Sequence, residues 1–315
     1  MTKNLIVFIA SLTILLLAAG CQPEKSEPVE TKTVEETTIE LPKPEPTKPE
    51  PTKPEPTKPK QPPAVSFHDK CADIFTAYVS DTGMVDYKNL KYKKLTLKKL
   101  LDEFDNLDPN HYKAWPREDK IAFWINAYNI QMLDIILENY PIESSRILRL
   151  FWPPNSIRHI KGIWSDYKFI IMDEEFTLLQ LQRRFFRKEF DEPRVFFAIC
   201  NASLSSPSLR NEPYYGRTLN QQLDNQVKSF LSSPRAFEID RNAKVVRLSA
   251  ILQPTWFGSE FMSKYAIDRK FKDHPPAVRA VLNFITNYLP EQDVGFLETE
   301  NYTIEYIKYD WILNE

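Results

Sequence analysis

The sequence predicts an α+β fold, with a single mixed helix-and-sheet domain over residues 64–315 behind a disordered proline-rich stalk. Two contrasts support this division. Residues 22–63 contain no aromatic residue, whereas the later part of the chain is rich in aromatic and apolar residues. About 250 residues can bury one substantial core. Helical and extended apolar spacings intermix in this part without βαβ regularity, which favours α+β over α/β.

The first twenty residues have the pattern of a lipoprotein signal peptide. Lys3 is followed by the apolar run Leu5–Leu17 and by small residues before Cys21, which resembles a bacterial lipobox. The run is shorter than the ~20 residues that span a bilayer. We expect removal of residues 1–20 and acylation of Cys21, which would tie the protein to a lipid bilayer of the cell envelope. Gln22 favours an outer-membrane destination; an ordinary signal peptide with a chance cysteine is the alternative.

A stalk is expected over residues 21–63. The motif Lys-Pro-Glu-Pro-Thr repeats from Lys43 to Lys58. Proline fixes φ and removes amide donors, so this stretch favours polyproline II at ~3.1 Å per residue and a reach of up to ~100 Å. We interpret it as a spacer; a segment that threads peptidoglycan or binds an envelope partner is the alternative.

Apolar residues at helical spacing predict six helices in the folded part. They cover Phe67–Val79, Leu95–Leu107, Trp115–Asn139, Phe176–Phe190, Leu219–Leu231 and Pro276–Leu289. The third has the clearest start, because Pro116 precedes Glu118 and Asp119, and acids in a first turn suit the helix dipole.

Short apolar or alternating segments predict strands. They are Met84–Tyr87, Tyr167–Met172, Arg194–Cys200 and Tyr302–Lys308, with a hairpin of Phe237–Ile239 and Val245–Leu248. Ser156–Ile160 is expected as a half-buried strand, because Arg158 and His159 alternate with isoleucines. Tyr306–Asn314 is expected to dock as a closing strand.

Several classes of site are excluded. No two of the six glycines are close, which excludes Gly-rich phosphate loops and the Gly-x-Ser-x-Gly elbow. The four histidines, His68, His111, His159 and His274, lack metal-ligand spacing, so we expect no metal and no cofactor.

The formal charge of −2 comes from a stalk with nine Glu and seven Lys, one leader lysine and a folded part near −1. We see no block of like charge and expect no nucleic-acid partner. Beside Cys21, only Cys71 and Cys200 remain, which is too few for a disulfide framework; whether they pair stays open.

Two polar strings are candidates for a site. Asn126 and Asn129 share a helix face, and we favour their bracing a loop over their lining a pocket. The run after Cys200 is rich in serine, including Ser203 and Ser206, at a strand exit where nucleophiles and oxyanion donors often sit. A capped turn is the alternative there. His159 is more often a structural histidine than a base.

Several strings in order make the domain similar to domain of unknown function 547 across nearly its whole length. They are Val85-Asp86-Tyr87, Ala122-Phe123-Trp124-Ile125-Asn126-Ala127-Tyr128-Asn129, Ser156-Ile157-Arg158, Pro193-Arg194-Val195-Phe196-Phe197-Ala198, Ala202-Ser203-Leu204-Ser205-Ser206-Pro207, Leu248-Ser249 before Trp256-Phe257, and Tyr309-Asp310-Trp311. The resemblance implies no established activity.

The resemblance also implies that three positions differ here from many relatives. In the helix predicted over Phe176–Phe190, many relatives carry Glu and His where this sequence has Gln182 and Arg183. After the predicted strand, they carry a cysteine where this sequence has Asn201. Ser206 stands at a second cysteine position. Cys200 is one residue away from 201, and on a regular strand such an offset turns a side chain to the opposite face.

We keep two hypotheses. The first is a non-catalytic binding or scaffold domain of an envelope lipoprotein, with a cleft lined by Asn126, Asn129, Arg183, Asn201 and Ser203. Arg183 would then favour an anionic or carbonyl group. The second is a divergent cysteine- or serine-type hydrolase or acyl-transfer enzyme that uses Cys200 or Ser206 with His159 as base. The missing Cys, His and Glu favour the first.

Overall fold

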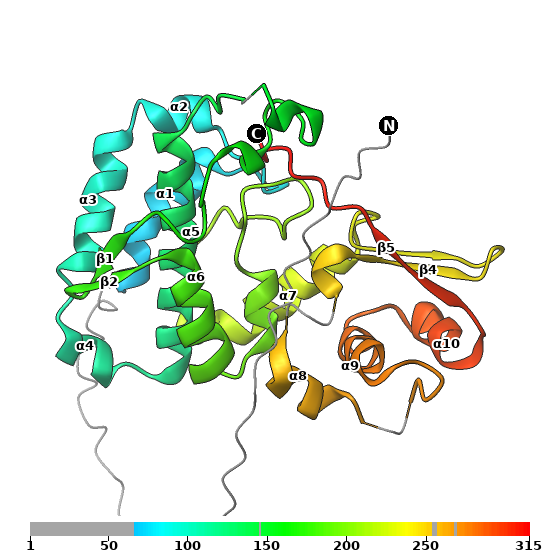
Figure 1. The fold of residues 1–315 in the computed structure, drawn as a ribbon. Coiled ribbons are helices and arrows are strands. Elements are labelled where there is room, and N and C mark those ends of the chain that lie inside the picture. Colours follow the sequence, from blue (N-terminus) through cyan, green and yellow to red (C-terminus); the bar gives the residue numbers. More distant parts are fainter. Residues whose placement is uncertain (1–65, 145, 254–256, 268–269) are drawn as a thin grey trace, which may run out of the picture. The chain divides into compact units, whose positions relative to one another are not determined.

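In the computed structural model, the long helix α5 (Arg117–Glu138) is the central element of the fold (Figure 1). It begins after Pro116, with Glu118 and Asp119 in its first turn, as predicted. Sixteen of its 22 residues are buried. A helix that is apolar on all sides must be covered on all sides, so neighbouring elements surround it.

The structure describes residues 66–315 except 145, 254–256 and 268–269. They belong to one compact unit, Gln61–Glu315. The expected signal peptide, Cys21 and stalk lie outside the described residues. Within the part described, no helix combines the length and apolarity that crossing a bilayer requires.

Short helices precede α5 and pack around it. They are the 3-10 helix η1 (Phe67–Cys71), α1 (Ala72–Tyr78), α2 (Tyr87–Lys91), α3 (Lys94–Asp105) and α4 (Pro109–Ala114). Ser66 caps η1, and its side chain accepts from the backbone N–H of His68. The helices predicted near the start of the domain are therefore present. The extended piece predicted at Met84–Tyr87 is reduced to one bridge between Val79 and Val85, because α2 already begins at Tyr87.

A long connection leaves α5 and holds two 3-10 turns, η2 (Leu148–Leu150) and η3 (Ile157–His159). A small antiparallel ribbon of β1 (Phe169–Ile171) and β2 (Glu174–Phe176) follows. The chain then enters α6 (Leu178–Leu181), which continues as a π-helix over Gln182–Glu189. The predicted helix over Phe176–Phe190 is thus mostly π-helical.

The second half of the described chain adds a three-stranded sheet, four α-helices and three short 3-10 helices. The elements are η5 (Pro193–Phe197), η6 (Gly216–Thr218), α7 (Leu219–Leu231), β3 (Phe237–Asp240), β4 (Val245–Ser249), η7 (Ala250–Leu252), α8 (Gly258–Tyr265), α9 (Pro276–Ile285), α10 (Glu291–Thr299) and β5 (Thr303–Ile307). The sheet order is β3-β4-β5, and β5 joins β4 in parallel after the α8–α10 crossover. This confirms α+β, the hairpin, α7 and the final strand.

Two hydrophobic clusters stabilise these halves. One surrounds α5, where Trp124 stacks on Phe185 at 3.7 Å between ring centroids. The other joins α7, the sheet and α8–α9, with Phe257, Phe261 and Phe284 in mutual ring contact. Both clusters lie inside the described part of the chain, so this part carries its own core.

The strand predicted over Arg194–Cys200 is wrong. The segment begins as the 3-10 helix η5, because Pro193 presets φ at its start and Glu192 accepts from the backbone N–H of Arg194. Burial explains the misleading pattern, since Val195, Phe197 and the residues after them are covered from all sides. A continuous apolar run does not distinguish a buried strand from a buried turn.

Two further strand predictions fail because a capped turn or isolated bridges take the place of a continuous ladder. Ser156–Ile160 folds as η3, where the Ser156 side chain caps the turn by accepting from the backbone N–H of Arg158. The C-terminal segment after β5 docks, as expected, but through isolated bridges of Ile312 with Ser156 and of Leu313 with Ser203. Docking here does not require a continuous ladder.

Candidate functional site

The two asparagines of α5 brace backbone that comes from elsewhere in the chain. Asn126 donates to the carbonyl of Tyr214 and accepts from its N–H, both at 2.9 Å. Asn129 donates to the carbonyl of Ala198 at 3.0 Å and accepts from the N–H of Cys200 at 2.9 Å. Both side chains are buried. The expected bracing is present; contact with a ligand stays a prediction.

Between these asparagines, Tyr128 organises a buried network of neutral groups. Its hydroxyl donates to Asn201 Oδ1 at 2.8 Å and accepts from Gln182 Nε2 at 2.8 Å. Trp164 Nε1 donates to the same Asn201 oxygen at 3.1 Å. Burial is the main cause that raises the pKa of the Tyr128 phenol well above its usual value. The network therefore holds no charge at physiological pH.

The structure brings Gln182 and Asn201 together but leaves Arg183 apart. Arg183 is exposed and lines a separate open hollow of about 360 Å³ with Glu174 and Gln180. Gln182 faces the buried network at the start of the π-helix, whereas the next two residues, Arg183 and Arg184, face solvent. The three positions at which many relatives differ therefore do not form one set here.

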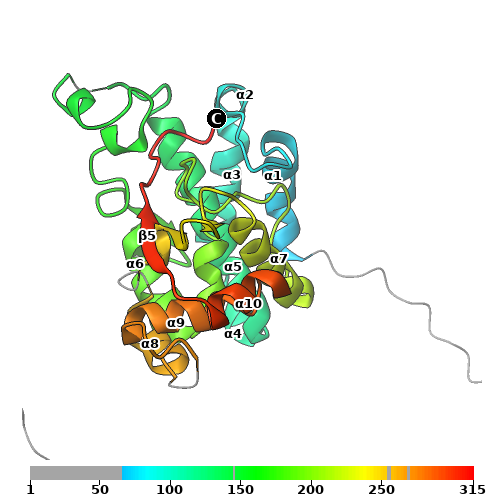
Figure 2. The ribbon, with the colours of Figure 1, turned by 90° about the vertical axis from the view of Figure 1, so that its right-hand side faces the viewer.

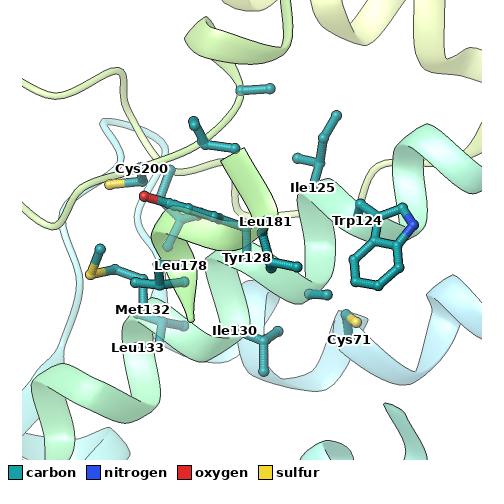
Figure 3. Close-up of a cluster of buried hydrophobic side chains, with 14 of the residues drawn as sticks. Cys71, Trp124, Ile125, Tyr128, Ile130, Met132, Leu133, Leu178, Leu181 and Cys200 are labelled. Atoms are coloured by element: carbon teal, nitrogen blue, oxygen red, sulfur yellow. The ribbon is translucent and has the colours of Figure 1, made fainter. Parts of the chain in front are cut away.

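Cys200 is buried beside the neutral network. Its Sγ accepts from the N–H of Ala202 at 3.4 Å and from Asn314 Nδ2 at 3.7 Å. Burial raises the pKa of its thiol. In Figure 3 the Tyr128 hydroxyl lies next to Cys200, whereas Cys71 lies at the other end of the cluster. Both cysteines are free thiols and do not pair.

A tight turn follows Cys200, so the expected side-to-side alternation of a strand does not apply. Ala202 adopts φ 54°, in the left-handed region. Two serines stabilise the turn: Ser206 Oγ accepts from the N–H of Asn201 at 2.7 Å, and Ser205 Oγ accepts from the N–H of Asp310 at 2.9 Å. A hydroxyl that accepts in this way keeps its own proton to donate.

The serine turn borders a hollow of about 190 Å³, which we call the serine hollow. Its lining includes seven hydroxyl residues: Thr82, Ser203, Ser205, Ser206, Ser208, Ser229 and Ser233. Arg235 contributes a guanidinium, and none of the described residues that line the hollow is acidic. Ser203 also contacts the Tyr309 hydroxyl at 2.8 Å. The hollow thus offers hydrogen-bond donors and one positive charge.

His159 does not meet the nucleophile candidates. Its Nε2 lies 2.8 Å from the carbonyl of Pro153, within the same loop. Among the described residues, no hydrogen bond joins its ring to Cys200 or Ser206, which our second hypothesis requires. The arrangement is that of a structural histidine.

Sequence reasoning missed a second histidine, His68, which is only 2% exposed. Its Nε2 lies 3.3 Å from Asp119 Oδ1, and its Nδ1 lies 3.4 Å from Asn126 Nδ2. Burial lowers the pKa of His68, and Asp119 partly opposes this effect. The pair borders a cavity of about 700 Å³ that includes His111 and Asp108. Only Asp119 in the first turn of α5 gave a signal, and that signal indicated a helix start.

Metal binding has no obvious ligands in this part of the chain. The described residues contain no group of three or more His, Cys, Asp or Glu side chains that could hold a metal ion.

Residues 112–231 match the family model described as "Protein of unknown function, DUF547". The match includes α5, the π-helix, the serine turn and α7. The resemblance expected across nearly all of the domain is therefore supported for this central part. Comparisons with curated proteins and with solved structures gave no significant match.

Proposed function

We propose that this protein is a lipid-anchored protein of the cell envelope whose folded domain binds a partner without catalysing a reaction. The observation that carries the proposal is the neutral network of Gln182, Tyr128 and Asn201. It fills the place where the family resemblance implies an ionisable pair. Amide and phenol groups that satisfy one another supply neither a nucleophile nor a base at neutral pH.

The remaining nucleophile candidates support the same view. Cysteine reacts as its thiolate, and burial raises the pKa of the Cys200 thiol, which keeps it protonated. The Ser206 hydroxyl accepts from the turn backbone, and His159 is held by Pro153. Among the described residues, no hydrogen bond joins Cys200 or Ser206 to a histidine or a carboxylate, which general-base catalysis requires.

The serine hollow is the proposed binding site. Its hydroxyl donors and the guanidinium of Arg235 favour a ligand rich in acceptor oxygens, such as a carboxylate or a sugar. Asn129 and the C-terminal segment hold the turn in place, so the donors are preorganised. Peptidoglycan carries such groups and lies within the envelope, which makes it the first candidate ligand.

A binding test uses purified peptidoglycan sacculi and the chain from residue 22 onward, which keeps the whole compact unit. We expect the chain to co-sediment with sacculi, and Arg235→Ala with Ser208→Ala to weaken this binding about tenfold. Ser232→Ala is the matched control, because that exposed serine bonds within its own helix end and lies outside the serine hollow. Equal binding by all three proteins would contradict the site.

Reactivity separates binding from catalysis. We expect iodoacetamide to leave the native protein unlabelled and to label its cysteines only on unfolding in urea. A fluorophosphonate should label neither the native nor the unfolded protein, because among the described residues no hydrogen bond joins Ser206 to a base that would activate it. Fast labelling of native protein that is lost in His159→Ala would instead establish the hydrolase alternative.

The anchor has its own test. Acyl chains contribute ~0.8 kcal/mol per buried methylene, so two or three of them hold a protein stably on a membrane. We expect the full chain to incorporate a palmitate analogue and to fractionate with membranes, and Cys21→Ala to lose the label. A Cys21→Ala chain that still incorporates the analogue would overturn the lipidation site.

A further inference from the structure

Positive charge is concentrated in two segments of the folded part. Residues 87–101 contain six lysines and no acid, and residues 146–165 contain three arginines, one lysine and no acid. The whole chain has a formal charge of −2, so the other segments are correspondingly acidic. The expectation that the chain has no block of like charge is therefore wrong, because the near-neutral total conceals this separation.

The same two segments carry the most exposed large apolar side chains of the described residues. Tyr92 and Leu95, at the junction of α2 and α3, are 80% and 77% exposed. Ile147, Leu150 and Phe151, at η2, are 72%, 80% and 70% exposed. Apolar groups gathered at protruding tips indicate an interaction surface more strongly than scattered ones do.

Both tips project from the same end of the folded part. Figures 1 and 2, which differ by a rotation about the vertical axis, both place α2 and the green loop after α5 at the top. Two contacts join the first segment to the start of this loop: Lys91 Nζ donates to the carbonyl of Tyr140 at 2.5 Å, and Tyr87 stacks on the Tyr140 ring. Tyr140 lies where the loop leaves α5.

Aromatic side chains join this loop to the C-terminal segment. The Arg158 guanidinium lies 5.0 Å from the Trp152 ring and 5.1 Å from the Trp311 ring. Trp164 also contacts Trp311, and all three tryptophans are only partly buried. Half-buried tryptophans next to apolar tips and basic residues are typical of surfaces that sit at a membrane–water interface.

We infer that residues 87–101 and 146–165 form a docking face for an anionic lipid bilayer. Lysine and arginine near such a surface are attracted by its negative potential, while the apolar tips enter the headgroup region. The acids that border the two segments in the sequence, Asp86, Asp102, Glu103, Glu143 and Asp166, are outnumbered by the ten cations. A nucleic acid would use the cations and aromatic rings but gives no burial to Leu95, Ile147 or Leu150, so the aliphatic tips favour lipid.

This inference deepens the proposed function, because an acylated Cys21 would keep the domain near a bilayer. The two claims can fail separately. Lipidation is tested by Cys21→Ala in the full chain, whereas the docking face is tested on a chain that lacks Cys21.

Vesicle flotation tests the face with the chain from residue 22 onward. We expect binding to vesicles of equal parts phosphatidylglycerol and phosphatidylcholine, weak binding to phosphatidylcholine alone, and loss of binding as salt rises. Leu150→Ser with Phe151→Ser should reduce the partition coefficient at least tenfold, as should Tyr92→Ser with Leu95→Ser. Arg146→Gln with Arg149→Gln should reduce it several-fold, and only on anionic vesicles.

Matched controls remove similar groups elsewhere. Ile170→Ser with Ile267→Ser removes exposed apolar side chains outside the face, and Lys188→Gln with Lys272→Gln removes exposed cations outside it. All substituted residues are exposed, and thermal unfolding checks that each variant folds. The inference is overturned if the wild-type chain does not float, if controls and face variants lose binding equally, or if the tip variants change only self-association or nucleic-acid binding.

Discussion

The buried network around Tyr128 and the docking face differ in the charge of their polar side chains. Inside, Gln182 and Asn201 are neutral, and each bonds to the Tyr128 hydroxyl at 2.8 Å. Outside, ten cations share two segments with five strongly exposed apolar side chains. The buried network holds no charged group, whereas the two surface segments carry ten cations and no acid of their own. Our two proposals follow this difference, since they assign binding to the surface and no chemistry to the interior.

The energetic reason for a neutral interior is desolvation. A buried ionised carboxylate or thiolate costs several kcal/mol unless it is paired and hydrogen-bonded. Neither Gln182 nor Asn201 has a cationic side chain among its described bonding partners, and the histidine position suggested by the family resemblance is the exposed Arg183. Without a cation nearby, glutamine and asparagine are the groups that this network tolerates.

A charged side chain placed in the buried network should reduce the stability of the fold more than any other change proposed here. Gln182→Glu removes the donor to Tyr128 and buries a carboxylate without a cation, so we expect a loss of about 3 kcal/mol in the free energy of unfolding at pH 8. Burial would raise the pKa of the new carboxyl group. The folded state then binds more protons than the unfolded state, so the loss should shrink toward pH 4.

Urea unfolding at several pH values measures this effect, and Lys99→Glu gives the comparison on the docking face. That exposed substitution should change stability by less than about 0.5 kcal/mol. Equal and small effects of both substitutions would show that the interior network is not closed to charge.

Substitution of Asn129, which braces the backbone on both sides of Ile199, should reduce the free energy of unfolding nearly as much. Asn129→Leu leaves the carbonyl of Ala198 and the N–H of Cys200 without their partner, with an expected loss of about 2–3 kcal/mol. Asn106→Ala is the control, because that exposed amide bonds only to the carbonyl of Asp102 one turn earlier in the same helix. Native thiol labelling gives a second readout: Cys200 should become reactive in Asn129→Leu but not in Asn106→Ala.

Elements with a strong local signal could be predicted from the sequence. The start of α5 after Pro116, the amphipathic helix α7 and the β3–β4 hairpin all follow from caps, spacing and turn residues. Segments with apolar or alternating runs but a local cap could not be assigned, because Arg194–Cys200 and Ser156–Ile160 have the composition of strands but begin as capped 3-10 turns.

The candidate site was predictable only in part, because local spacing can be read from the sequence whereas tertiary packing cannot. The asparagine face on α5 followed from helical spacing, and so did its bracing role. The separation of Arg183 from Gln182 depends on which helix face is buried, which the sequence around a π-helix does not reveal. The link between His68 and Asp119 and the meeting of two basic segments depend on tertiary packing.

The smallest expected effect on stability concerns Asp134, which lies on α5 near Lys94 and Lys98 of the docking face. Asp134 of α5 has a buried carboxylate oxygen without a hydrogen-bond partner among the described residues. Burial and the nearby Glu138 raise its pKa from 3.8 to about 6, while Lys94 and Lys98 oppose the shift. Because the folded-state pKa is the higher one, the folded state binds the proton more tightly. The stabilisation is complete below pH ~4 and is lost as pH rises through about 6.

Asp134→Asn should therefore raise the free energy of unfolding by about 1 kcal/mol at pH 8 and leave it nearly unchanged at pH 4. The figure is below the full value of the pKa shift, because the carboxyl group is only partly buried. Exposed Asp102→Asn serves as the control, with an expected change below about 0.5 kcal/mol at either pH. A loss of stability at pH 8 that disappears at pH 4 would contradict this prediction and would mean that Lys94 and Lys98 already stabilise the ionised carboxylate. In that case lysines of the docking face would also stabilise a partly buried carboxylate of α5, and the contrast between a neutral interior and a charged surface would not hold at Asp134.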